Sequence, residues 1–478
     1  MSVFTKKKDE QFMAWYLDVI RRAEIVDTRT GVKGANVLMS NGYEIWKRMQ
    51  NILDEKFYGT NHKTMIFPLL IPEKFLMMEK EHFAGFVPEV ALVTHAGEKK
   101  LEENYALRPT SETIMYHLYS QWIRSYTDLP LKVNQWCNII RIDTKDTRPL
   151  LRDREFYWTE AHTCHETAEE AEEQVKESMW IYSTFFDECC LPYLVLKRPK
   201  HDTFPGAEYS VAYDCPLPDG KSLQIGTTHN LAQGFSKVFK IKFQKADGKH
   251  DFAYQTCYGL STRVIAAVIG VHGDDRGLIL PPYLAPTQVA IIPIIFKSKE
   301  EKVQKISKEL YEKIKLSGIR VILDDGPKTS GWKFNEYELR GVPIRIEIGP
   351  RDVEKGTVVI VRRDTKEKIE VKNEDIIVEI QKQFEAITTK LKQRAKNLLE
   401  ESISTLKTLE EIEEKFNTKK PGFIRTNWCG NRKCAEYVKE NFRANILGTK
   451  YGKVEQVFGD CPVCGEKAKH VVYLSRTY

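Results

Sequence analysis

The chain has 478 residues, of which 42% are hydrophobic and 29% are charged, and its net charge is +6. This composition is typical of a soluble, globular protein of about three domains, and the mild excess of positive charge suits a polyanionic partner without requiring one. The sequence has no apolar run of about 18 residues and no basic-then-apolar N-terminal segment. It therefore predicts neither a membrane span nor a signal peptide, and it favours a cytoplasmic location.

Two amphipathic helices are predicted near the N-terminus. The first covers residues 9–24. The second follows Asn41 and Gly42, and its apolar residues recur at the three- and four-residue spacing of one helix face. This second helix is interpreted as one that turns its apolar face to a core. Its apolar positions are Tyr43, Ile45, Trp46, Met49, Ile52, Leu53 and Phe57.

A short polar segment, ALRPTSET at residues 106–113, precedes an apolar and aromatic run from Ile114 to Trp122. Thr110 offers a hydroxyl oxygen and Glu112 a carboxylate, and both groups accept hydrogen bonds. Two acceptors so close together suit a small cation. The segment therefore predicts a cation-binding loop.

Arginines are concentrated in a predicted strand–loop–strand unit over residues 131–162. Its two ends are rich in β-forming residues, and its middle is polar and contains a proline. Guanidinium groups inside a β run can be held toward a site, where they bind phosphate or carboxylate oxygens through two parallel hydrogen bonds. A solvated basic loop is the alternative interpretation. The four arginines are Arg141, Arg148, Arg152 and Arg154.

Residues 167–244 predict a helix followed by several strands. Thr167 and Glu170 have the spacing of a capping box, which opens a helix that runs to about Cys190. Residues 207–244 then read as strands joined by turns. One β run ends in a group of polar side chains, Gln224, Thr227 and His229. A lone histidine is more often structural, so His229 is a weak candidate by itself.

The segment from Gly259 to Arg263 leads into an apolar helix that reaches about Gly270. An arginine at a helix start can serve a phosphate, because the free backbone N–H groups of the first turn attract the same anion. Ser261 and Arg263 are therefore candidate phosphate ligands. The chain has no Walker A loop, no Rossmann glycine fingerprint and no HExxH, so the usual nucleotide-binding folds and zinc proteases lose support.

A proline-rich break at residues 280–286 marks the first predicted domain boundary. Strand-like and helix-like segments alternate from 287 to 375, including a charged helix over 298–316, and such alternation is typical of an α/β unit. Residues 375–416 are predicted to form a long charged helical stretch. The remaining residues, 417–478, form a compact end that carries cysteines.

The ten cysteines fall into two groups. Six are scattered between Cys137 and Cys257, and in a chain without a secretion signal they are expected to be reduced and partly buried. The other four form two close pairs, each of which lets two sulfur atoms approach one ion. They predict a structural zinc site, with a set of reduced thiols as the alternative: Cys429, Cys434, Cys461 and Cys464.

Together these segments resemble the class II aminoacyl-tRNA synthetases, and specifically the archaeal/eukaryotic-type prolyl-tRNA synthetases, over nearly the whole chain. RPTSET is similar to the family's amino-acid loop, RIDTKDTRPLLRDREF to class II motif 2, and TCYGLSTRVIAAVIGVHGDDRGLILPP to motif 3. The resemblance implies an α+β fold. It consists of an antiparallel-sheet catalytic domain over residues 1–285, an α/β anticodon-binding domain over 286–385 and a small zinc-binding α+β domain over 386–478.

The resemblance also implies the activity of a proline–tRNA ligase. Such an enzyme uses ATP with Mg²⁺ to convert L-proline to prolyl-adenylate and then transfers the prolyl group to the 3′ end of tRNA(Pro). It implies Arg141 and Arg263 as catalytic residues. The implied proline ligands are Thr110, Glu112, Arg141, Trp158, Glu160, His162 and His229. The implied ATP ligands are Arg141, Asp143, Arg152, Gln224, Thr227, Ser261 and Arg263, and the implied anticodon contacts are Glu338, Arg351 and Asp352.

The resemblance also implies that the protein is a homodimer. The chain departs from the family pattern at two positions. Motif 1 usually has a proline near position 40, where this chain has Ser40, and the usual Arg-x-Glu of motif 2 is Arg141-Ile-Asp143. The family's C-terminal tyrosine, which reaches back toward the active site, corresponds to Tyr478. The resemblance gives its terminal carboxylate a functional role.

Selection of proline must rest on shape, since its ring carries no polar handle, and shape discriminates about 10–200-fold per methylene. We therefore predict misactivation of alanine and cysteine. Residues 163–255 offer no spare domain-sized segment for an editing domain. The alternatives are a synthetase for another small amino acid and a catalytically dead tRNA-binding paralogue. The dead paralogue would be expected to lose some of Glu112, Arg141, Arg152 and Arg263, all of which are present.

Overall fold

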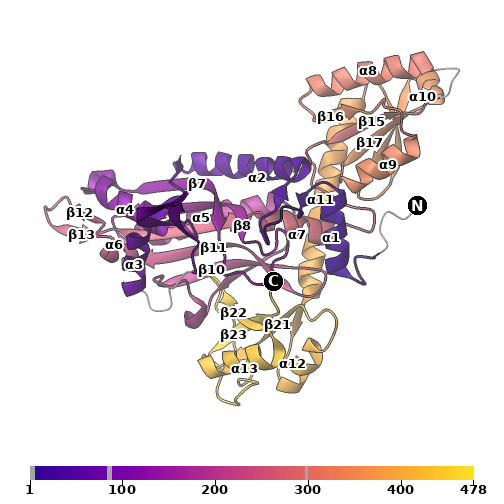
Figure 1. The fold of residues 1–478 in the computed structure, drawn as a ribbon. Coiled ribbons are helices and arrows are strands. Elements are labelled where there is room, and N and C mark those ends of the chain that lie inside the picture. The colour runs from indigo at the N-terminus through magenta and orange to yellow at the C-terminus, as the bar shows by residue number, and fades with distance from the viewer. Residues whose placement is uncertain (1–5, 83–88, 296–299) are drawn as a thin grey trace.

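The computed structural model describes residues 6–82, 89–295 and 300–478, and one 11-stranded sheet runs through the body of the molecule (Figure 1). Neighbouring strands are antiparallel except at the two edges, where β3 lies parallel to β7 and β20 parallel to β21. The predicted antiparallel sheet is thus confirmed. In spatial order the strands are β20 (Ile403–Thr405), β21 (Phe423–Trp428), β23 (His470–Ser475), β22 (Asn445–Lys450), β9 (Leu194–Lys197), β10 (Tyr209–Pro216), β11 (Ser222–Ala232), β14 (Tyr254–Ser261), β8 (Glu155–His165), β7 (Leu131–Ile140) and β3 (Lys63–Thr64).

Four helices and the central strands share the largest hydrophobic core: α1 (Phe12–Arg22), α2 (Ser40–Gly59), α5 (Ala168–Glu188) and α7 (Arg263–His272). On α2 the side chains of Ile45, Met49 and Leu53 are fully buried, as their four-residue spacing predicts. Burial of each such side chain contributes about 1.5–3 kcal/mol. Tyr43 was also predicted to face the core, but it lies away from the helix face of Ile45, Met49 and Leu53 and is 46% exposed.

The start of α5 shows a modified form of the predicted capping box. The Thr167 hydroxyl accepts a hydrogen bond from the backbone N–H of Glu170, as the motif requires. The carboxylate of Glu170, however, accepts from the N–H of Glu166 rather than from that of Thr167. The helix ends at Glu188, close to the predicted end at Cys190.

A second hydrophobic core packs a group of short elements against strands of the central sheet. Figure 1 shows these elements together at the end of the sheet away from the α/β unit. It places the beginning of α4, where Glu112 is the first residue, beside β7 and β8. The elements of this region are β4 (Leu70–Pro72), α3 (Glu73–His82), β5 (Leu92–Ala96), β6 (Lys99–Leu107), α4 (Glu112–Trp122), α6 (Gly234–Val238), β12 (Lys242–Gln244) and β13 (His250–Phe252). A separate pair, β1 (Val26–Asp27) and β2 (Val37–Leu38), precedes α2.

The predicted α/β unit is confirmed as a five-stranded mixed sheet with helices, placed at one end of the molecule (Figure 1). Strands β15, β16 and β17 are parallel, and β18 and β19 continue the sheet in antiparallel fashion. Of the predicted helix 298–316, residues 300–316 are helical, and 298 and 299 lie outside the described residues. The elements are β15 (Val289–Pro293), α8 (Glu300–Leu316), β16 (Val321–Leu323), α9 (Ser330–Leu339), β17 (Ile344–Ile348), α10 (Pro350–Lys355), β18 (Thr357–Arg362) and β19 (Lys368–Lys372).

The α/β unit packs closely against the loop that follows α7. A Cβ atom on Gly277 would lie 2.5 Å from the Cα of Leu339, so only glycine fits this position, and its φ of +138° also favours glycine. Beside it the guanidinium group of Arg363, which is almost fully buried, donates two hydrogen bonds to Asp274, of 2.6 and 2.9 Å. The contact therefore combines tight backbone packing with a paired charge.

A single long helix, α11 (Ile376–Ser402), leads from the α/β unit past α7 to the C-terminal unit (Figure 1). The prediction of a continuous helical stretch over 375–416 is wrong in its middle. The chain leaves the helix at Ser402, forms β20 alongside β21, and starts α12 (Leu409–Phe416) at a capping box made by Thr408 and Glu411. The proposed domain boundary at 385 lies inside α11.

The C-terminal unit, completed by α13 (Arg432–Phe442), is continuous with the central sheet because β22 pairs with β9. The sequence did not predict this junction. The predicted combination of an antiparallel-sheet domain, an α/β domain and an α+β end is nevertheless confirmed. Among the described residues, no helix combines the length and the apolar composition that crossing a bilayer requires.

Candidate functional site

A cavity of about 690 Å³ opens on the central sheet, and every side chain that the sequence predicts for the amino acid and the nucleotide lines it. These side chains come from strands, turns and helix starts that are far apart in the sequence. They are Thr110, Glu112, Arg141, Asp143, Arg152, Trp158, Glu160, His162, Gln224, Thr227, His229, Ser261 and Arg263.

Strand register explains why these residues meet. Side chains two residues apart in a strand point to the same face, so Trp158, Glu160 and His162 of β8 all face the cavity. The neighbouring strands supply partners on the same face. Across β8 and β14 the pairs are Trp158 with Ser261, Glu160 with Gly259 and His162 with Cys257, and across β11 and β14 they are Thr227 with Gly259 and His229 with Cys257.

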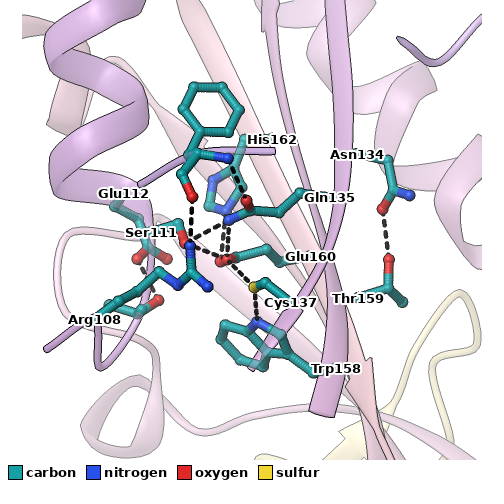
Figure 2. Close-up of polar contacts among 12 residues, drawn as sticks. Arg108, Ser111, Glu112, Asn134, Gln135, Cys137, Trp158, Thr159, Glu160 and His162 are labelled. Carbon is teal, nitrogen blue, oxygen red and sulfur yellow. Dashed lines mark hydrogen bonds and ion pairs between the residues drawn. The ribbon is translucent and has the colours of Figure 1, made fainter. Parts of the chain in front are cut away.

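The buried carboxylate of Glu160 is the centre of a hydrogen-bond network (Figure 2). Its Oε1 atom accepts from the Ser111 hydroxyl and, at 2.6 Å, from the Gln135 amide, while Oε2 lies 3.1 Å from Nε2 of His162. Burial alone would raise the pKa of Glu160. The hydrogen bonds from His162, Ser111 and Gln135 outweigh burial and lower this pKa below its usual range, so Glu160 is an anion at neutral pH.

His162 is the basic partner of Glu160 in this network. Burial works against a charged imidazole, but the hydrogen bond to Glu160 and the charges of Glu112 and Glu160 raise the pKa of His162 above its usual value. Its second ring nitrogen, Nδ1, lies 2.9 Å from the hydroxyl of Tyr116. Both nitrogens therefore have partners that fix the plane of the ring.

Glu112 is the carboxylate left to meet an incoming cation. It is 5% exposed, accepts a hydrogen bond from the Thr110 hydroxyl, and begins α4, where the helix N-terminus favours negative charge. Burial nevertheless raises the pKa of Glu112, and the neighbouring Glu160 adds to the effect, while His162 opposes it. A cation bound beside Glu112 would reverse this shift and hold the anionic form.

An aromatic wall and a guanidinium group close one side of the cavity. The guanidinium of Arg141 lies 5.5 Å from the ring centre of Phe156 and 5.4 Å from that of Trp158, and its Nε donates to the carbonyl of Pro109 at 3.1 Å. The indole N–H of Trp158 points to the sulfur of Cys137 at 3.2 Å, which fixes the indole plane (Figure 2). The wall offers an apolar surface next to a fixed positive charge.

Arg263 begins α7, and its Nε donates to the carbonyl of Leu151 at 2.9 Å. Removal from water lowers the pKa of Arg263 to about 10, and the nearby charges of Arg141 and Arg152 add to the effect. The group remains a cation at neutral pH. Three guanidinium groups that repel one another in one cavity indicate a site built for a polyanion.

The part of the cavity around Gln224 contains contacts that the sequence did not predict. The Gln224 side-chain oxygen accepts a hydrogen bond from Arg198 at 3.0 Å, and Arg198 also forms a two-bond ion pair with the buried Asp214, at 2.7 and 2.9 Å. The pair fixes the orientation of the Gln224 amide. Only strand pairing across β9, β10 and β11 brings these residues together, so no local motif could have revealed them.

His229 is a neutral member of the site. Burial lowers the pKa of His229 to about 3, and the charges of His162 and Arg198 contribute. Its Nδ1 lies 2.7 Å from the Ser210 hydroxyl, and its ring lies 5.0 Å from that of Phe204. The residue therefore shapes the cavity wall and offers no charge to a ligand.

Tyr478 lines the same cavity, as its predicted position near the active site requires. Its hydroxyl donates to the carboxylate of Asp219, and its backbone N–H donates to Ser222 at 3.2 Å. The guanidinium of Arg148 lies 5.5 Å from the centre of its ring. The C-terminal residue thus contacts the arginine-rich loop between β7 and β8.

The three residues predicted to contact an anticodon lie in the α/β unit. Glu338, at the end of α9, accepts hydrogen bonds from Arg276 at 2.9 Å and from Arg345 at 3.1 Å, and sequence reasoning had not singled out Arg345. The carboxylate of Asp352 accepts from the N–H of Gly349 at 2.7 Å and so caps α10, where Arg351 is exposed. Their predicted role remains a prediction.

The four paired cysteines converge in the C-terminal unit. Their sulfur atoms lie within 4.8 Å of one another, with 3.6 Å from Cys429 to both Cys434 and Cys464. A tetrahedral zinc site with bonds of about 2.3 Å places its sulfur atoms about 3.8 Å apart, so the arrangement fits this metal. Glycines with positive φ follow two of the cysteines, at Gly430 and Gly465, and allow the chain to turn around an ion.

Three family descriptions match successive parts of the chain. Residues 95–272 match the tRNA synthetase class II core domain (G, H, P, S and T), residues 288–383 match an anticodon binding domain, and residues 409–478 match the C-terminal domain of prolyl-tRNA synthetase. Together these matches cover the cavity, the α/β unit and the cysteine cluster.

Similar proteins cover the whole chain. The proline–tRNA ligase of Methanopyrus kandleri is 45% identical over 98% of this chain and 96% of its own length, and that of Pyrococcus abyssi is 45% identical over 99% of both. Among solved structures, Giardia lamblia prolyl-tRNA synthetase in complex with prolyl-adenylate has a TM-score of 0.95 and 36% identity, with both chains fully covered. Prolyl-tRNA synthetase from Cryptosporidium parvum with L-proline and AMP has a TM-score of 0.93 and 34% identity over 100% of this chain and 97% of its own.

Proposed function

Since this chain belongs to the family of archaeal/eukaryotic-type prolyl-tRNA synthetases, which are ATP-dependent aminoacyl-tRNA ligases, we propose that the cavity on its central sheet is where L-proline meets ATP. The enzyme activates proline as prolyl-adenylate and transfers the prolyl group to tRNA(Pro). The comparisons give no support to a non-catalytic paralogue. The observation that carries the site proposal is that all of the predicted ligands line one cavity.

The end of the cavity near α4 is assigned to the ring of proline. The secondary ammonium has two N–H donors, and Glu112 and Thr110 present a carboxylate and a hydroxyl oxygen to them. Glu160 is already paired with His162, so Glu112 is the carboxylate available for the positive charge. The ring packs against Trp158.

The end of the cavity near α7 is assigned to ATP. Arg152 and Arg263 hold the phosphates, and the strand residues Gln224 and Thr227 of β11 and Ser261 of β14 complete the nucleotide contacts. Asp143 is assigned to the same half, where it stands in place of the family's glutamate. Mg²⁺ bound to ATP supplies further positive charge on the phosphate oxygens.

The chemistry of activation needs no nucleophile from the protein, because the carboxylate of proline attacks the α-phosphate itself. The protein contributes position and charge. Arg141 lies between the two halves and can bridge the carboxylate of proline and the α-phosphate as charge moves between them. Arg263 stabilises the negative charge that develops on the phosphate oxygens.

The four cysteines of the C-terminal unit are assigned to a structural zinc ion. Four thiolate ligands leave no coordination position open for substrate, so the metal would stabilise the fold and take no part in catalysis. Cys429 directly follows β21, and Cys461 and Cys464 precede β23, so the ion would help to hold these two paired strands in register.

The α/β unit is assigned to the anticodon of tRNA(Pro), with Glu338, Arg351 and Asp352 as candidate contacts. A guanine base offers both a donor edge for carboxylates and an acceptor edge for arginine. A homodimer and a cytoplasmic location complete the proposal. The motif 1 region supports the dimer, because Val32, Val37 and Tyr43 expose 62%, 52% and 46% of their surface and could be covered by a second copy.

Amino-acid-dependent exchange between ATP and pyrophosphate, screened over the twenty amino acids, tests the proposal. Proline should give by far the fastest exchange, with slower exchange for alanine and cysteine. Exchange that is fastest with an amino acid other than proline would overturn the assignment of the cavity.

A further inference from the structure

Three side chains at the proline end of the cavity form a compact set of potential metal ligands. Glu112, His162 and Cys257 each offer one ligand atom, and these atoms all lie within 4.8 Å of one another. The residues are 5%, 1% and 5% exposed. They come from α4, β8 and β14, and His162 and Cys257 stand directly opposite each other in the sheet.

The chemistry of these donors selects a class of ion. A carboxylate oxygen, an imidazole nitrogen and a thiol sulfur are the ligands of zinc, with bonds of about 2.0–2.3 Å, whereas magnesium and calcium prefer oxygen ligands alone. Tetrahedral bonds of this length place the ligand atoms about 3.3–3.8 Å apart. Side-chain rotations that move the ligand atoms by about 1 Å would bring them to this spacing around an ion.

The surroundings of His162 already resemble those of a metal-bound histidine. One ring nitrogen lies beside the Tyr116 hydroxyl at 2.9 Å and the other beside the Glu160 carboxylate at 3.1 Å. The ion replaces the proton and the hydrogen bond at one ring nitrogen, the proton being released to solvent, and the other nitrogen keeps a partner that fixes the ring. Such partners behind a metal-binding histidine change metal affinity by roughly 10–100-fold.

We propose that Glu112, His162 and Cys257 form a second metal site, separate from the four-cysteine set, that takes Zn²⁺ in competition with proline. The inference rests on the proposed function, because Glu112 cannot pair with the ring ammonium of proline and bind an ion at the same time. Three protein ligands leave a fourth position open toward the cavity. The site is inhibitory: the ion raises the proline concentration that the enzyme needs and leaves the requirement for ATP unchanged.

Cobalt binding to the full-length protein tests this inference directly. The four-cysteine set is first filled with one equivalent of Zn²⁺, and Co²⁺ is then added while the near-ultraviolet absorption from thiolate to cobalt is recorded. A second equivalent should bind, and its apparent Kd should rise linearly with added L-proline. Cys257→Ser should weaken this binding by roughly tenfold or more, as loss of a ligand requires. The matched control Cys215→Ser, which changes a buried cysteine of β10, should leave it unchanged.

Three results would overturn the inference. They are the absence of a second equivalent, binding that Cys257→Ser leaves within twofold, and binding that saturating proline does not displace. If Cys257→Ser does not fold, Cys257→Ala and the competition between Co²⁺ and proline in the unmodified protein decide the question. Proline-dependent exchange in chelator-treated buffer is measured in parallel. Loss of that exchange would count against the proposed function, whereas its presence without metal binding would count against the second site alone.

Discussion

Replacement of Glu112 by glutamine probes the proposed pairing of its carboxylate with the ring ammonium of proline. Glutamine keeps the size of the side chain and an oxygen that can accept from Thr110, but it removes the negative charge. A hydrogen bond to a charged group contributes about 1.5–3 kcal/mol, and breaking a buried ion pair costs about 3–5 kcal/mol. Because Glu112 is 5% exposed, the loss should fall in the range of about 2–4 kcal/mol.

This loss corresponds to a decrease of roughly 30- to 700-fold in kcat/KM for proline, at 1.4 kcal/mol for each factor of ten. Exchange between ATP and pyrophosphate, measured with proline and ATP varied in turn, gives both constants. The KM for ATP should stay within about twofold, since Arg141, Arg152 and Arg263 are untouched. Glu102→Gln, on an exposed position of β6, is the matched control. The reasoning is refuted if Glu112→Gln keeps kcat/KM for proline within threefold of the unmodified enzyme, or if it impairs ATP and proline equally.

Four further outcomes are expected. Burial raises the pKa of Glu112, and only the anionic carboxylate can pair with the ammonium of proline. Therefore kcat/KM for proline should fall as the pH drops through that raised pKa. A pH profile of kcat/KM should show this acidic decrease, and Glu112→Gln should abolish it. Arg263→Lys keeps the charge but loses the planar fork, so kcat should fall by roughly 10²–10³-fold while proline affinity, measured by equilibrium dialysis, stays within threefold. Chelation of the zinc ion proposed for the four-cysteine set should lower the Tm and speed hydrogen exchange in β21 to β23 before it does so in β7 and β8. An unchanged Tm would argue against a structural metal. Alanine should support measurable exchange, since shape alone discriminates about 10–200-fold per methylene, and silence with both alanine and cysteine would show that a further selection device exists.

The residues that the sequence singled out line one cavity, and their placement there follows from local rules. Trp158, Glu160 and His162 alternate along one strand, so a correct strand assignment puts all three on one face. Thr110 and Glu112 adjoin the start of a helix, and Arg263 begins another. The resemblance to the family's amino-acid loop and to motifs 2 and 3 then indicated that these segments meet at one site.

The features that the sequence missed depend on long-range pairing. The bond from Gln135 to Glu160 exists because β7 and β8 place these residues opposite each other. The link from Arg198 to Gln224 needs β9, β10 and β11 side by side, and the junction of β22 with β9 joins residues about 250 positions apart. Hydrophobic periodicity reports which face of a strand is buried, but it does not report which strand lies beside it.

The break in the predicted 375–416 helix has a different cause. Charged residues with high helix propensity lie on both sides of the break, and the serines and β-branched residues of 402–405 weaken the helix preference there without by themselves predicting a strand. The chain stops there because β20 gains a partner in β21, which is a tertiary effect. The capping box at Thr408 and Glu411 was the available signal that a new helix begins.

The assignment of Glu112, Thr110 and Arg141 to proline can be checked in a crystal structure of the enzyme with L-proline and a non-hydrolysable ATP analogue. In that structure the ring nitrogen should lie within about 3.2 Å of both the Glu112 carboxylate and the Thr110 hydroxyl, and the guanidinium of Arg141 should lie between the carboxylate of proline and the α-phosphate. A proline ring whose nitrogen points away from Glu112, or an α-phosphate out of reach of Arg141, would contradict this assignment.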